Sequence, residues 1–129
     1  MEFKIDTKDN YTILSPDATR LDVNLTDALR QKWEELTKSG RKNLIVDFYS
    51  LKTIEESALE SLARLHETVY AQNQSLVFCR MNSDCLSFFK AKDLELVLNF
   101  APTFEEAIDI VSMEILEREL FSEEDEEME

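Results

Sequence analysis

Apolar residues alternate with polar ones, or cluster in short runs, in the segments where strands are expected. Five segments show this pattern: residues 3–5, 11–14, 43–48, 75–79 and 96–98. The first two lie on either side of a short polar turn, and Pro16 ends the second of them. The third and fourth are mostly apolar, which is typical of strands that are buried on both faces of a parallel sheet.

Four other segments have apolar residues at the spacing of a helix that buries one face. The first covers residues 25–36, and Gly40 after it is expected to cap the C-terminal end. The next two begin near Thr53 and Ser83, and the last begins at Thr103. Thr53 and Thr103 are each followed three residues later by Glu, which is the pattern of a capping box at the start of a helix.

Strands and helices therefore alternate along the chain in the order β-β-α-β-α-β-α-β-α. Alternation at this spacing implies right-handed crossovers and helices packed on a mostly parallel sheet. We expect an α/β fold: a single domain with a mixed, mostly parallel sheet of about five strands and four helices. The length of 129 residues suits one domain, and a single glycine with two prolines argues against a turn-rich all-β sandwich or barrel.

The net charge of −14 limits the classes of partner that the protein can bind. A surface this acidic cannot neutralise phosphate groups. We therefore expect no binding to nucleic acid and no docking on an anionic membrane. No apolar run approaches the ~20 residues needed to span a bilayer, and the N-terminus lacks the apolar stretch of a secretory signal. We expect no membrane insertion and a cytoplasmic location.

Half of that charge lies at the C-terminus. Residues 117–129 hold eight acidic residues and one basic residue, Arg118, a net charge of −7. We expect a domain over residues 1–118 and a disordered acidic tail over 119–129, because the tail has almost nothing to bury. Two roles for the tail stay open: solubility, or competition for a basic partner.

The sequence offers no catalytic, metal or cofactor site. A single glycine cannot build a phosphate-binding loop or a nucleophile elbow. His66 has no second histidine with which to form a triad or metal cluster, and it falls near the core face of the second predicted helix. Cys79 and Cys85 are too few for a zinc site or a disulfide framework, so we expect two reduced thiols and a protein that is not an enzyme.

The segment Asn43-Leu44-Ile45-Val46-Asp47-Phe48-Tyr49-Ser50-Leu51-Lys52-Thr53-Ile54-Glu55-Glu56-Ser57-Ala58-Leu59 resembles the centre of the STAS domain. This family includes bacterial anti-sigma factor antagonists and the cytoplasmic tails of sulfate transporters. It has a strand ending in Asp, a short loop, and then Asp-Ser-Ser/Thr-Gly-Leu at the start of a helix. Residues 19–24 are similar to the family's Leu-Asp element, and residues 64–66 and 76–79 also fit, so the resemblance covers residues 3–116.

The chain departs from the family pattern at the start of the second predicted helix. In phosphorylatable members, the serine directly after the Asp is modified by the cognate anti-sigma kinase. That position here is Glu56, with Glu55 in place of the Asp, Ser57 at the second hydroxyl position and Ala58 in place of the glycine. Glu56 is either a permanent, imperfect mimic of phosphoserine or the cap partner of Thr53. Ser57 is a candidate phosphosite or an ordinary solvated serine.

The resemblance implies a non-enzymatic regulatory module that binds a protein partner, such as a kinase-like anti-sigma factor or a related regulator. We expect it to act as a monomer or weak dimer. The expected partner-binding residues are Asp22, Asn24, Glu55, Glu56, Ser57 and Leu59. Two alternatives stay open: a STAS scaffold subunit of a lipid-transport or stress-sensing complex, and a STAS module that binds a small molecule or nucleotide at the loop ends of the sheet. Against the second, two glutamates at the helix start repel phosphate.

Overall fold

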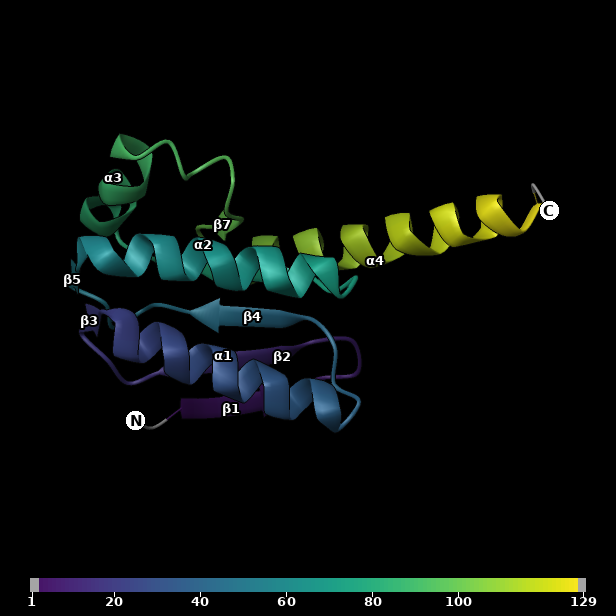
Figure 1. Ribbon diagram of the computed structural model, residues 1–129, viewed down its shortest axis with the longest axis horizontal. Coiled ribbons are helices and arrows are strands. Elements are labelled where there is room, and N and C mark those ends of the chain that lie inside the picture. Colours follow the sequence, from purple (N-terminus) through teal and green to yellow (C-terminus); the bar gives the residue numbers. More distant parts are fainter. Residues whose placement is uncertain (1–2, 128–129) are drawn as a thin grey trace.

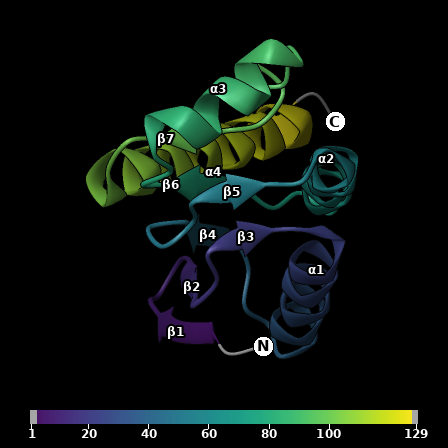
Figure 2. The ribbon, with the colours of Figure 1, turned by 90° about the vertical axis from the view of Figure 1, so that its left-hand side faces the viewer.

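A five-stranded sheet lies between α1 and α2 on one face and α4 on the other in the computed structural model (Figures 1 and 2), which describes the backbone of residues 3–127 and the side chains of residues 3–122. The elements in chain order are β1 (Phe3–Thr7), β2 (Thr12–Pro16), β3 (Arg20–Leu21), α1 (Val23–Lys38), β4 (Leu44–Asp47), β5 (Thr53–Ile54), α2 (Glu56–Ala71), β6 (Leu76–Cys79), α3 (Ser83–Ala91), β7 (Phe100–Ala101) and α4 (Phe104–Glu127).

The main sheet has the strand order β1-β2-β4-β6-β7. The hairpin of β1 and β2 is antiparallel, and every later neighbour in this sheet is parallel. A separate sheet of two residues per strand joins β3 to β5 in parallel. The structure confirms the predicted α/β class, with four helices and a mixed, mostly parallel sheet of five strands.

Both faces of the central strands are buried, which explains why their sequences are apolar without strict alternation. Leu44 and Val46 of β4 pack with α1 and α2, whereas Ile45 packs on the opposite face with Val77 and Val111. Such a strand is stabilised by two helical layers at once, because each face removes apolar surface from water.

The ends of two predicted helices are as expected. Gly40 follows α1 with a φ of +86°, a left-handed conformation that glycine adopts without a steric cost. At the start of α4, the backbone N–H of Glu106 donates to Oγ1 of Thr103 over 3.2 Å, so the capping hydrogen bond predicted there is present.

The position of the last strand was predicted wrongly. Residues 96–98 form a turn after α3, and the strand that pairs with β6 is β7, where Phe100 lies opposite Phe78. Leu96 is 93 % exposed, whereas Leu98 is buried against the core. A run of three apolar residues therefore did not mark a strand, because only one of the three is buried.

Helix α4 continues to Glu127, so residues 119–127 are helical where the sequence predicts disorder. Leu, Glu and Arg have high helix propensity, and a helix that is already nucleated by packing extends with one hydrogen bond per added residue. Figure 1 shows the C-terminal part of α4 extending beyond the edge of the sheet. The predicted domain end at residue 118 stays a prediction, and residues 128–129 lie outside the described part of the chain.

Candidate functional site

The two short strands β3 and β5 bring together the segments that were predicted to bind a partner. Arg20 pairs with Thr53, and Leu21 pairs with Ile54, just before α1 and α2 begin. The N–H of Glu55 donates to the carbonyl of Leu21 over 2.9 Å. The N-terminal ends of the two helices are therefore fixed next to one another (Figure 2).

At the start of α1, Asp22 has a structural role. It is the N-cap, and its Oδ1 accepts a hydrogen bond of 2.8 Å from the N–H of Leu25. Asn24 is the second residue of α1 and is exposed. Of these two predicted residues, Asn24 has its side chain free of the cap and open to a partner.

At the start of α2, the predicted capping box is wrong. Thr53 belongs to β5, and α2 begins at Glu56, with Glu55 as the N-cap residue. The Glu56 carboxylate instead accepts a 2.5 Å ion-pair contact from Nζ of Lys92, at the end of α3. This hydrogen bond and the charge of Lys92 lower the pKa of the Glu56 carboxyl. Glu55 forms an ion pair with Arg20.

The remaining two predicted residues differ in exposure. Ser57 is exposed in the first turn of α2. Leu59 is only 4 % exposed and belongs to the core, because its position on α2 faces the sheet. Leu59 can support the surface from below but has little area to offer a partner.

The sequence did not predict that the loop after α3 belongs to this end of the molecule. The ion pair with Glu56 places Lys92 beside α2, and the loop that follows exposes Leu96 and Val97. The apolar run at residues 96–98 predicted a strand, because a short run of this kind occurs both in buried strands and in exposed binding loops.

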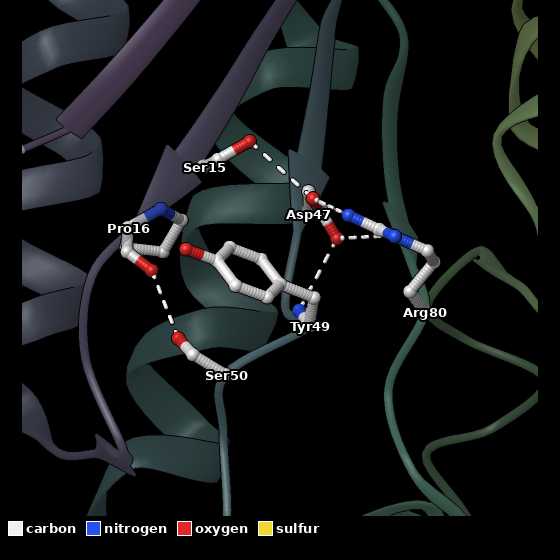
Figure 3. Close-up of polar contacts among 6 residues, drawn as sticks. All are labelled: Ser15, Pro16, Asp47, Tyr49, Ser50 and Arg80. Atoms are coloured by element: carbon white, nitrogen blue, oxygen red, sulfur yellow. Dashed lines mark hydrogen bonds and ion pairs between the residues drawn. The ribbon is translucent and has the colours of Figure 1, made fainter.

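A second polar cluster lies at the carboxyl ends of β4 and β6 (Figure 3). Asp47 ends β4 with its side chain 2 % exposed. Its Oδ1 accepts from Nε of Arg80 at 2.9 Å and from the N–H of Tyr49 at 3.2 Å. Its Oδ2 accepts from Nη2 of Arg80 at 2.5 Å and from Oγ of Ser15 at 3.4 Å. The buried carboxylate is therefore fully compensated.

The cluster fixes the loop that leads from β4 to β5. Asp47 holds the N–H of Tyr49, and Oγ of Ser50 donates to the carbonyls of Pro16 and Ala18 at 3.1 and 2.7 Å (Figure 3 draws the first). The guanidinium of Arg80 lies 4.5 Å from the ring centroid of Phe104 and 5.3 Å from that of Tyr49. Because this loop ends in β5, the cluster also sets where α2 begins.

Burial shifts the pKa values of both cysteines and of the single histidine. Burial, helped by the charge of Asp47, raises the pKa of the Cys79 thiol to about 12, and burial also raises the pKa of Cys85. Burial lowers the pKa of His66, whose ring is tilted against that of Tyr70 with 4.4 Å between the ring centroids. In the described part of the chain, no three His, Cys, Asp or Glu side chains are grouped as metal ligands. The same residues include no helix long and apolar enough to cross a membrane.

The family model of the STAS domain matches residues 2–107, which include both helix starts and the loop between β4 and β5. The chain belongs to the STAS domain family. This agrees with the resemblance found in the sequence around Asp47 and Glu56. Comparison with curated proteins gives no match.

Solved structures support the STAS fold. The chain is similar to an anti-sigma factor antagonist from Mycobacterium paratuberculosis, with 15 % identity, a TM-score of 0.70, and 86 % and 93 % of the two chains covered. It is similar to an anti-sigma-factor antagonist (STAS) domain protein from Planctomyces limnophilus, with 14 % identity, a TM-score of 0.66, and 85 % and 97 % covered.

The phosphorylated form of the Bacillus cell fate determinant SpoIIAA is also similar in structure. It has 19 % identity and a TM-score of 0.59, and the match covers 85 % of this chain and 99 % of that one. At these identities the likeness establishes the fold, and the chemistry of this STAS domain has to be argued from its own residues.

Proposed function

We propose that this STAS domain is a non-enzymatic regulatory module that binds a protein partner through the paired starts of α1 and α2. The observation that carries the proposal is the exposed carboxylate of Glu56 at the first residue of α2, the position at which phosphorylatable members of the family have serine. We include Asn24, Glu55 and Ser57 in the same contact surface.

The electrostatics of this position support the role of a fixed acidic group. A negative charge is stabilised at a helix N-terminus, where backbone N–H groups lack helical partners. Lys92, directly after α3, supplies a cation for the Glu56 carboxylate. Glutamate carries one negative charge, against about −1.5 to −2 for phosphoserine, and it offers fewer acceptor oxygens. The module therefore has a permanent, weaker version of a phosphorylated surface.

Two similarities support an anti-sigma factor or a related regulator as the partner. The structural neighbours include anti-sigma factor antagonists, and one of them is a phosphorylated form. We expect the module to act in the cytoplasm, together with such a partner. Because residue 56 has no hydroxyl group, the partner cannot reset this surface by phosphorylation at that position.

The binding proposal is tested with the partner recovered by affinity purification from the source cell and then purified. Ser57→Arg places a bulky cation at the centre of the surface, and we expect the dissociation constant to rise at least about tenfold. Thr68→Arg makes the matching change near the other end of α2 and should leave affinity unchanged. Equal affinity for wild type and Ser57→Arg would show that the partner binds elsewhere.

The phosphorylation state is tested by incubating the protein with its partner kinase and ATP. Wild type is expected to remain unlabelled, whereas Glu56→Ser is expected to acquire phosphate at residue 56. Phosphate on Ser57 of the wild type, located by mass spectrometry, would contradict a surface that is fixed in one state.

A scaffold role in another assembly is the second candidate, and the same surface would serve it. A partner identified as a transporter ATPase, rather than a regulator of sigma factors, would support it. The Ser57→Arg and Thr68→Arg comparison would still report whether the helix starts form the interface. The partner's identity and the interface are therefore tested separately.

A further inference from the structure

The outward face of α4 carries an uncovered stripe of apolar side chains. Met113, Leu116, Leu120 and Phe121 are between 50 % and 63 % exposed. Their spacing of three, seven and eight residues from the first places them on neighbouring turns of one helix side. The stripe covers about 12 Å at 1.5 Å per residue. It lies beyond residue 107, where the STAS family match ends.

The other side of the same helix already has its partner. Ala107 and Val111 are fully buried against Ile45 and Val77 of the sheet. A helix of a small domain is normally polar on the side that faces away from the core. Because α4 is apolar on two opposite sides, one apolar surface is satisfied by the sheet and the other has no partner among the described residues.

The charges that α4 itself carries on the side of the stripe are negative. Glu117 lies within the stripe, and the exposed Asp109 lies about one turn before it. Arg118 is the single basic residue in the sequence of α4, and its Nη2 donates to Oδ1 of Asn43 and Oγ of Ser75 at 3.1 and 3.0 Å. Arg118 is therefore turned toward the sheet and does not offset the acids on the outer side.

We propose that the outward face of α4 binds an amphipathic helix of a partner protein, one whose apolar stripe is flanked by Lys and Arg. Apolar contact supplies the attraction in the centre of the interface, and the acids around it select a basic partner. This surface is separate from the paired starts of α1 and α2, so the proposal does not rest on the one above.

A second copy of this chain does not fit the stripe. In an antiparallel pair of α4 helices, Asp109 of one copy would lie near the acidic C-terminal turns of the other. In a parallel pair, Glu117 would lie near its own counterpart. Either arrangement brings like charges together at an apolar contact, where they are destabilising.

The proposal is tested with a synthetic peptide of about 20 residues that forms a helix with Leu along one side and Lys on both flanks. Binding to the 129-residue chain is measured by fluorescence anisotropy at about 150 mM salt. The variant Leu116→Gln with Leu120→Gln removes apolar surface without a change in charge, and we expect its affinity to fall at least about tenfold. Leu96→Gln with Val97→Gln makes the same change at another exposed site and should bind as wild type does.

Further measurements test the role of charge and the location of the binding surface. A peptide in which Glu replaces the flanking Lys should bind at least about tenfold more weakly, and equal binding would remove the argument from charge. Equal binding by the Leu116→Gln, Leu120→Gln variant would show attraction to the acids alone. Failure of the Lys peptide to bind wild type would overturn the proposal, as would a dimer, seen by light scattering, that the two substitutions abolish. Ser57→Arg should leave peptide binding unchanged, which separates this surface from the first.

Discussion

Asp47 shows how one buried charge constrains the chain around it. Its carboxylate is almost fully removed from water and accepts hydrogen bonds from Arg80, Tyr49 and Ser15. Removing one partner of such a group leaves a buried charge without its counter-ion, and this costs much more than the pair itself contributes. Arg80 reaches Asp47 from a left-handed backbone conformation, with φ of +59°.

We expect Arg80→Ala to lower the free energy of unfolding by about 3 kcal/mol, because it strands the Asp47 carboxylate. Urea denaturation followed by circular dichroism measures the change. Arg64→Ala is the matched control, since it breaks an exposed ion pair with Glu60 and should cost less than about 0.5 kcal/mol. Similar losses in the two variants would mean that Asp47 is not held as the structure shows.

His66 links stability to pH. Burial lowers its pKa more than the nearby Glu114 raises it, so the folded protein binds a proton less readily than the unfolded chain does. The free energy of unfolding should therefore fall as the pH drops from about 7.5 toward 5.5, through the unfolded pKa of about 6.5. His66→Gln should flatten this dependence. A rise in stability over the same interval would show that Glu114 outweighs burial.

The helices α1 and α2 begin in different ways at the candidate surface. At α1, a side-chain cap is present, because Asp22 accepts from Leu25. At α2, the start is set by strand pairing of Thr53 and by the ion pair of Glu56 with Lys92. The two helices therefore begin in two ways, depending on what the neighbouring elements offer.

We expect Asp22→Ala to lower the free energy of unfolding by about 1 kcal/mol, the usual contribution of an N-cap side chain. Asp22→Asn keeps an accepting oxygen and should recover most of the loss. Asn24→Ala, two residues later and exposed, should be close to neutral. Denaturation midpoints of the three variants test this, and a neutral Asp22→Ala would exclude the capping role.

In the molecule as a whole, the net charge of −14 is the main electrostatic influence on the free energy of unfolding. Repulsion among like charges destabilises a compact state, and dissolved salt screens it. We expect the free energy of unfolding to rise when sodium chloride is increased from about 0.05 to 0.5 M. A fall with added salt would instead show that surface ion pairs, such as the one between Lys32 and Glu35, outweigh the general repulsion.

The sequence predicted most of the fold because apolar periodicity reports which positions are buried. It located β4, β6 and α1 from their own residues. It did not locate β7, because the neighbouring apolar residues at 96–98 give the same local signal. It also included Leu59 among the partner-binding residues, although that side chain packs in the core.

What the sequence determined by itself was therefore local: the burial patterns and the acidic C-terminus. Tertiary structure decided three things that depend on residues far apart in the chain. Pairing of β3 with β5 brings the starts of α1 and α2 together. Arg80 compensates Asp47 from 33 residues away. The sheet covers one side of α4 and leaves the other open. Each depends on which surfaces meet in space, and periodicity along the chain carries no information about that.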